Sequence, residues 1–176
     1  ISVNYLGHMI EDHLKDGKDL GVNIEYIREK KPLGTAGSLT LLKTLPAEPM
    51  LVTNGDVLSE IEYSKLLDFH LRYNAHATMA VRLQERQNPY GVVKMDGVKF
   101  IGIDEKPKDQ FHVNAGIYVI SPCALNILKK NKRWDMTELF TKIMDSDLCT
   151  YAYPMHEPWL DVGSNEDFQK ANKQIT

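Results

Sequence analysis

The sequence predicts an α/β layered fold around a mixed, mostly parallel central sheet. Three observations support this class. Strand-like and helix-like segments alternate along the chain, with no internal repeat, low-complexity tract or linker. The apolar run 50–53 is bounded by proline and by Asn-Gly, as in a strand buried on both faces of a parallel sheet. Asp96 and Gly97 form the centre of a hairpin signal, which adds a short antiparallel section.

Each further element follows from the periodicity of apolar residues and from turn residues. Besides 50–53, strands are expected, in chain order, at 1–5, 22–27, 77–83, 91–95, 113–120 and 150–153. Helices are expected where apolar residues recur at helical spacing, at 6–17, 35–43, 63–70, 122–128, 136–144 and 165–173. Thr35 and Pro122 are residue types that favour helix starts, and the 136–144 segment has a clean apolar stripe.

Composition limits the partners and the compartment. A hydrophobic content of 43% and a charged content of 26% are typical of a globular domain. A formal net charge of −3 gives no electrostatic case for binding nucleic acid or an anionic membrane. No apolar run approaches the roughly 20 residues of a membrane span. Two dispersed cysteines, Cys123 and Cys149, favour a reduced, cytoplasmic setting.

Two aspartates stand at strand ends beside glycine. Asp56 follows Gly55 after the 50–53 strand, and Asp161 lies two residues before Gly163. Ligands of open α/β sheets bind beyond the carboxyl ends of strands, so both side chains are candidates for one cleft. Mg²⁺ uses one or two protein carboxylates and completes its octahedron with water and phosphate oxygens. A shared cation is one interpretation, and ordinary turn or cap aspartates are the alternative.

Two weaker signals lie elsewhere in the chain. The segment 33–38, Leu-Gly-Thr-Ala-Gly-Ser, opens an expected helix, where free backbone N–H groups can meet a polar ligand. It matches neither a Walker A loop nor G-x-G-x-x-G, and spacing alone favours a tight turn. Glu105 and Lys106 near a strand end offer partners for sugar hydroxyls and phosphate, although exposed pairs of this kind are common.

Other chemistries have little support. The six histidines show no metal-ligand spacing, no Gly-x-Ser-x-Gly elbow occurs, and neither cysteine has a neighbouring histidine. A glycosyltransferase usually relies on Asp-x-Asp, whereas 54–56 is Asn-Gly-Asp and has one carboxylate.

Six segments in a fixed order carry a resemblance to a known family. They are Glu29-x-x-Pro32-Leu33-Gly34-Thr35-Ala36-Gly37-Ser38-Leu39, Val52-Thr53-Asn54-Gly55-Asp56, Tyr90-Gly91-Val92-Val93, Glu105-Lys106-Pro107, Val113-Asn114-Ala115-Gly116-Ile117-Tyr118 and Trp159-Leu160-Asp161-Val162-Gly163. Together they resemble the sugar-1-phosphate nucleotidyltransferases, such as mannose-1-phosphate guanylyltransferases and glucose-1-phosphate thymidylyltransferases. The match covers nearly all of 1–176 as one domain. Bacterial guanylyltransferase-like proteins, some with a CBS-domain pair, look most similar.

The resemblance implies a Rossmann-like, three-layer nucleotide-diphospho-sugar transferase fold. That family opens with a strand and a loop of the type G-G-x-G-x-R-L-x-P, which wraps the triphosphate, and 1–5 looks like its second strand. The domain is therefore expected to be N-terminally truncated, with the first strand missing and an uncovered position in the sheet. Without the loop, this chain is expected to fold but not to turn over at a useful rate.

Carried over position by position, the resemblance implies one active site. The expected catalytic residues are Asp56 and Asp161, which hold Mg²⁺, and Lys106, which contacts the sugar phosphate. The expected substrate-binding residues are Glu29, Leu33, Gly34 and Thr35 around the nucleobase, and Gly91, Glu105 and Asn114 around the sugar.

The implied reaction is attack by a sugar 1-phosphate oxygen on the α-phosphorus of an NTP, which releases pyrophosphate. The 32–37 segment favours GTP. A non-catalytic module that binds a nucleotide sugar or a sugar phosphate, as in a regulatory paralogue, is the alternative. The sequence upstream of Ile1 would separate the two. The sugar and the oligomeric state stay open, with a homo-oligomer allowed.

Overall fold

The computed structural model describes residues 1–130, 132–163, 167 and 169. Its centre is a four-stranded sheet in the order β3–β8–β5–β9. These strands are β3 (Met50–Thr53), β5 (Ala77–Gln87), β8 (Lys108–Ile120) and β9 (Thr150–Met155). The sheet is mixed, as expected, but the expected parallel majority is not found among the described strands. β8 runs antiparallel to both β3 and β5, whereas β5 and β9 pair in parallel.

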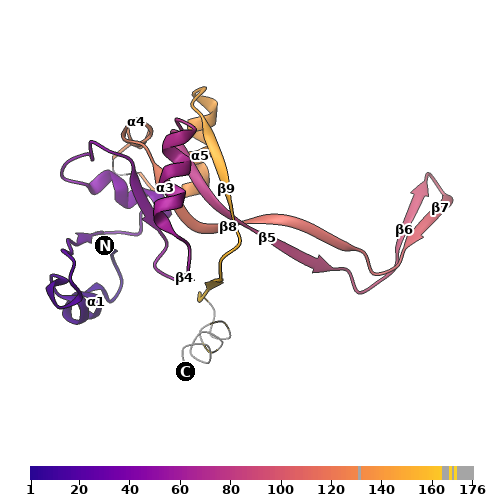
Figure 1. Cartoon of the computed structure of the whole chain (residues 1–176), viewed down its shortest axis with the longest axis horizontal. Coiled ribbons are helices and arrows are strands. Elements are labelled where there is room, and N and C mark those ends of the chain that lie inside the picture. Colours follow the sequence, from indigo (N-terminus) through magenta and orange to yellow (C-terminus); the bar gives the residue numbers. More distant parts are fainter. Residues whose placement is uncertain (131, 164–166, 168, 170–176) are drawn as a thin grey trace.

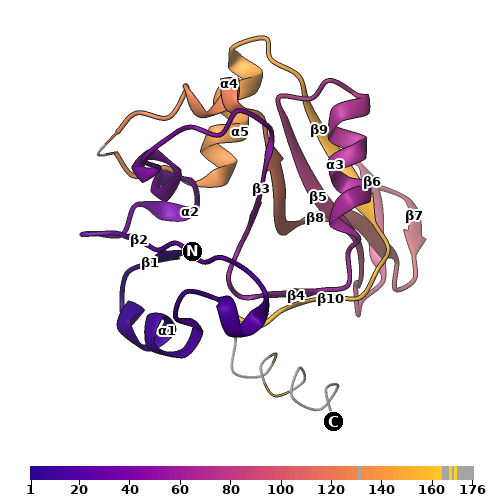
Figure 2. The ribbon, with the colours of Figure 1, turned by 60° about the vertical axis from the view of Figure 1, so that its left-hand side comes forward.

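Helices cover both faces of the central sheet, which confirms the three-layer arrangement (Figure 2). α3 (Tyr63–Arg72) packs on one face. The other face carries α2 (Gly34–Gly37), η2 (Ser38–Leu41), α4 (Pro122–Leu125) and α5 (Met136–Asp145). Side chains of β8 alternate between the two layers, so Ile117 and Val119 join the α3 core while Tyr118 and Ile120 join the α5 core.

The N-terminal elements lie beside this sheet. β1 (Ser2–Val3) and β2 (Ile27–Arg28) form a separate parallel pair, accompanied by α1 (Gly7–Leu14) and η1 (Lys18–Leu20). Among the described strands, neither β1 nor β2 pairs with β3, which is an edge strand of the central sheet. The resemblance implies an uncovered position in the sheet where the family's first strand would lie, and the edge of β3 is such a position. Of the strand expected at 22–27, only Ile27 lies in a strand, as the first residue of β2.

One expectation about β3 is wrong. The 50–53 run was predicted to be buried on both faces in a parallel sheet, but β3 pairs antiparallel with β8 and Leu51 is exposed. An apolar tetrapeptide does not specify its neighbours, so edge position and strand direction are decided by the rest of the sheet.

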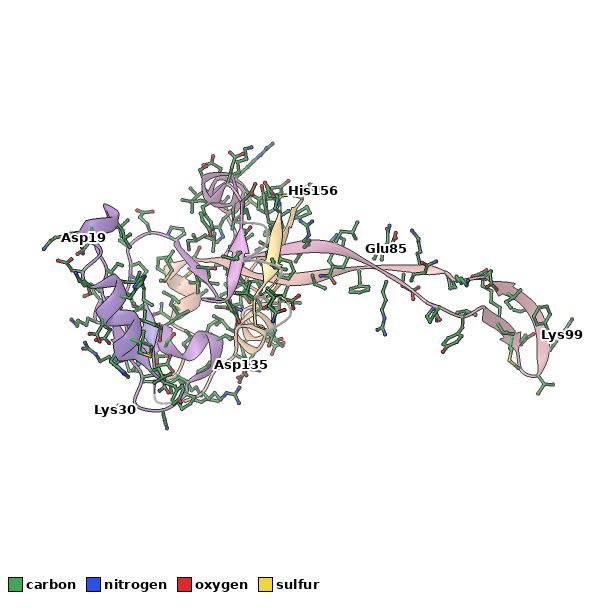
Figure 3. All side chains as sticks on the ribbon, turned by 90° about the horizontal axis from the view of Figure 1, so that it is seen from below. Asp19, Lys30, Glu85, Lys99, Asp135 and His156 are labelled. Atoms are coloured by element: carbon green, nitrogen blue, oxygen red, sulfur yellow. The ribbon has the colours of Figure 1, made fainter. Side chains whose placement is uncertain are left out.

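A long two-stranded arm projects from the body (Figure 1). β5 and β8 pair as far as Gln87 and Lys108, and the arm ends in the hairpin β6 (Val92–Asp96) and β7 (Lys99–Asp104). The expected hairpin is therefore confirmed, but Asp96 pairs with Lys99, so its turn is formed by Gly97 and Val98 and not by Asp-Gly. Figure 3 shows Glu85 along the arm and Lys99 at its far end. The hairpin exposes apolar side chains, including Val98, Phe100 and Ile101.

The last short pair, β4 (Val57–Ser59) and β10 (Trp159–Asp161), crosses the end of the body. The helix expected at 165–173 lies outside the described residues, apart from positions 167 and 169. No helix in the described part of the chain has the length and apolar content that a membrane crossing requires.

Candidate active site

The pairing of two short strands brings Asp56 and Asp161 together. β4 and β10 run antiparallel with Asp161 opposite Val57, and the Val162 N–H donates to the Asp56 carbonyl oxygen at 2.8 Å. A Cβ atom placed on Gly163 would lie 3.0 Å from Asp161 Oδ1 and 3.5 Å from Asp56 Oδ2. The two carboxylates, far apart in the sequence, therefore converge on one point.

Both carboxylates line an open cavity of about 570 Å³. The other described residues that line this cavity are Gln84, Trp159, Leu160, Gly163 and Asp167. Asp56 and Asp161 are exposed, and Asp161 Oδ1 accepts the Gly163 N–H at 2.9 Å. Two accessible carboxylates suit Mg²⁺, which keeps several waters and binds substrate phosphates. Among the described residues, no three His, Cys, Asp or Glu side chains gather as a metal site.

The turn expected to hold the nucleobase has a firm structural role. Glu29 accepts the Ser2 hydroxyl at 2.6 Å and the Leu33 N–H at 2.8 Å, which ties this turn to β1. The Thr35 hydroxyl accepts the Met136 N–H at 2.8 Å, so it caps α5 and not its own helix. Leu33 is buried, whereas Thr35 is exposed. Glu29, Leu33, Gly34 and Thr35 are thus gathered in one region of the fold.

The residues expected around the sugar are divided between two places. Gly91 and Glu105 are neighbours at the base of the β6–β7 hairpin, since a Cβ on Gly91 would lie 2.9 Å from Glu105 Oε2. Lys106 adjoins them with a positive φ of 46°. This hairpin lies at the far end of the arm from β4 and β10 (Figure 1). The structure therefore does not bring Gly91, Glu105 and Lys106 to the carboxylate pair.

Asn114 lies much nearer to the carboxylate pair. Its Oδ1 accepts the Gly116 N–H at 2.9 Å, and its Nδ2 donates to the Tyr118 hydroxyl at 2.8 Å. The Gly116 carbonyl in turn accepts the Asn54 N–H at 2.8 Å, two residues before Asp56. Both ends of the Asn114 amide are therefore engaged within the protein.

Five described residues of the cavity were not among the expected site residues: Gln84, Trp159, Leu160, Gly163 and Asp167. Gln84 belongs to β5, and nothing in the local sequence distinguishes it from its polar neighbours. In the sequence, Trp159 stands out only as the first residue of the 159–163 motif. Residues two apart on a strand point to the same face, so its spacing from Asp161 was a usable signal.

Fold and site together define a Rossmann-like α/β protein whose candidate ligand cleft lies at strand ends. The family model described as "Nucleotidyl transferase" matches residues 1–176, so the chain belongs to the nucleotidyl transferase family.

Curated relatives and solved structures agree with this membership. The mannose-1-phosphate guanylyltransferase catalytic subunit beta of Drosophila melanogaster is 34% identical over 96% of this chain and 47% of its own length. The protein of the same name in Dictyostelium discoideum is 32% identical over 96% of this chain and 48% of its own. This chain thus spans about half the length of these relatives. The crystal structure of HddC from Yersinia pseudotuberculosis shares the fold, with a TM-score of 0.72, 24% identity and coverage of 99% of this chain and 77% of that chain.

Proposed function

We propose that this protein transfers a nucleotidyl group from an NTP, with GTP favoured, to a sugar 1-phosphate. The convergence of Asp56 and Asp161 on one open cavity carries the proposal. An exposed carboxylate pair with room for phosphate oxygens is what a Mg²⁺-dependent phosphoryl reaction requires from the protein.

In the proposed reaction, an oxygen of the sugar 1-phosphate attacks the α-phosphorus of the NTP. The new P–O bond forms as the bond between the α-phosphorus and the bridging oxygen breaks, and pyrophosphate leaves with that electron pair. A phosphate oxygen is already an adequate nucleophile, so the protein mainly has to position the reactants and neutralise charge. Bound Mg²⁺ would neutralise phosphate charge, and Asp56 and Asp161 would hold it.

The remaining residues receive their proposed roles from the family. Glu29, Leu33, Gly34 and Thr35 would surround the nucleobase, and Asn114 would lie near the sugar. Gly91, Glu105 and Lys106 would contact the sugar and its phosphate only if the arm bends from its extended position towards the cleft (Figure 1). A homo-oligomer, an attached CBS-domain pair and a cytoplasmic location remain predictions.

The preference for GTP rests on the names of similar proteins. The relatives above are named guanylyltransferases that act on mannose 1-phosphate. One HddC structure with a TM-score of 0.68 is described as complexed with GMP-PN. These names also do not favour the non-catalytic alternative.

The test is pyrophosphate release with GTP, ATP, UTP and dTTP, each offered mannose, glucose, glucosamine and heptose 1-phosphates. It should be run on this chain and on a longer chain that includes a glycine-rich loop. In the active form, Asp56→Asn and Asp161→Asn should each lower kcat at least about 100-fold. Asp19→Asn is the matched control, because that carboxylate is 89% exposed and belongs to η1, away from the cleft.

Faster turnover with another NTP would overturn the choice of GTP. Binding of a nucleotide sugar without pyrophosphate release by the longer chain would identify a binding module. Full activity in both asparagine variants would remove the carboxylate pair from the mechanism.

A further inference from the structure

β8 is interrupted by a bulge where it passes the candidate site. In the pairing with β5, Tyr118 is opposite Met79 and Asn114 is opposite Val81, so β8 contains extra residues at this point. Gly116 lies within the bulge with a φ of +73°, a conformation that L-residues with a side chain rarely adopt. A bulge releases main-chain groups from the ladder, which makes them available to other partners.

Two successive carbonyl groups of the bulge accept hydrogen bonds from the two carboxylate-bearing segments. The Ala115 carbonyl accepts the indole Nε1–H of Trp159 at 2.8 Å, and the Gly116 carbonyl accepts the N–H of Asn54 at 2.8 Å. Trp159 lies two residues before Asp161, and Asn54 lies two residues before Asp56. The bulge therefore contacts each segment two residues before its carboxylate. The contact is made by the indole of Trp159 in one segment and by the backbone of Asn54, which continues the β3–β8 pairing, in the other.

The same two segments are also joined to each other beyond the bulge. The Val162 N–H donates to the Asp56 carbonyl at 2.8 Å, and Asp161 pairs with Val57. In each segment, a residue that precedes the carboxylate is thus bonded to the bulge. The two segments are bonded to each other at or just after the carboxylates. These bonds hold the backbones of the two segments together close to both carboxylates.

The side chains of the bulge are suited to this role. The Asn114 amide closes the bulge by bonding the Gly116 N–H and the Tyr118 hydroxyl. A Cβ on Gly116 would lie 3.0 Å from Asn54 Nδ2 and 3.0 Å from Val57 Cγ2, so only glycine lets the Asp56 segment approach this closely.

We propose that the bulge Asn114–Gly116 is the common anchor that sets the separation of Asp56 and Asp161, with Trp159 as a positioning residue for Asp161. The proposal rests on the proposed function insofar as this separation serves cation binding. Asn114 acts in it through the backbone of the bulge, whatever contact it makes with a sugar.

The two tryptophans provide a matched test. Trp159→Phe removes the indole N–H that reaches Ala115 and keeps an aromatic ring. Trp134→Phe removes an equivalent bond, from Trp134 Nε1 to the Lys129 carbonyl at 3.2 Å, at a different place in the fold. Amide hydrogen exchange, read by NMR, reports on the anchor without any ligand.

We expect exchange of the Val162 N–H to accelerate at least tenfold in Trp159→Phe and to stay within twofold of the wild type in Trp134→Phe. Asn114→Ala, at an exposed position, should accelerate exchange at Asn54 and Val162 in the same direction. If Trp159→Phe does not fold, Asn114→Ala still tests whether the bulge anchors the two segments. Unchanged exchange at Val162 in the folded variants, or equal acceleration in Trp134→Phe, would overturn the anchor.

Titration with Mn²⁺ alone, followed by the EPR signal of the free ion, separates this inference from the proposed function. Mn²⁺ prefers the same carboxylate ligands as Mg²⁺. The Kd should rise at least fivefold in Trp159→Phe and not in Trp134→Phe. Absence of Mn²⁺ binding by the wild type would count against the proposed cation, while the exchange result would still decide the anchor. An unchanged Kd in Trp159→Phe would overturn its positioning role.

Discussion

The turn that begins α2 offers a sharp test of the packing, because Gly34 is held against a rigid backbone. Its φ is +81°, and a Cβ there would lie 2.5 Å from the Trp134 carbonyl oxygen and 2.5 Å from Asp135 Oδ1. The Trp134 carbonyl accepts the Ala36 and Gly37 N–H groups, and the Trp134 N–H donates to the Leu33 carbonyl. The backbone at Trp134 therefore cannot retreat without breaking this set of bonds.

Gly21 provides a control with the same backbone conformation and no crowding. Its φ is +73°, and a Cβ there would meet nothing within 4 Å. Alanine at either position costs about 1 kcal/mol for its positive φ. At Gly34, overpacking adds about 2–3 kcal/mol. Gly34→Ala should therefore lower the free energy of unfolding by about 3–4 kcal/mol, and Gly21→Ala by about 1 kcal/mol.

Urea unfolding followed by circular dichroism would measure both values, with the slope of each transition checked against the wild type. Nearly equal destabilisation would show that the docking of the turn on Trp134 is looser than the contacts imply. A large loss in Gly34→Ala alone would establish that this family glycine stabilises the fold, whatever its part in binding a nucleobase.

Two further predictions concern a buried histidine and the arm. His70 is 1% exposed, and burial, together with the nearby His76, lowers its pKa below the ordinary value. Protonation is thus disfavoured in the folded state, so stability present above about pH 6.5 should fall as the pH drops, by at most about 1.4 kcal/mol per pH unit. Urea midpoints between pH 7.5 and 5 should fall less steeply in His70→Gln, and an unchanged slope would contradict this assignment. Lys106→Ala in the active form should raise the sugar-phosphate KM or lower kcat at least tenfold, about 1.4 kcal/mol, whereas Lys99→Ala should leave both unchanged. Equal kinetics in the two lysine variants would remove Lys106 from the site.

The sequence by itself determined the class of fold and the identity of the carboxylate pair. Alternating apolar patterns report local secondary structure, because the periods of strands and helices differ. They placed α3, α5 and the β6–β7 hairpin well. Glycine beside Asp56 and Asp161 indicated close approach at strand ends, and the structure brings these two side chains to one cavity. Their metal-binding role remains a prediction.

Only the tertiary structure decided which groups meet across long stretches of chain. Thr35 was expected to start its own helix, but its hydroxyl caps α5 through Met136, because two turns dock at Trp134. Trp159 and Asn54 converge on successive carbonyls of one bulge. No local pattern encodes such pairings, since strand order, register and bulges depend on the packing of all layers at once.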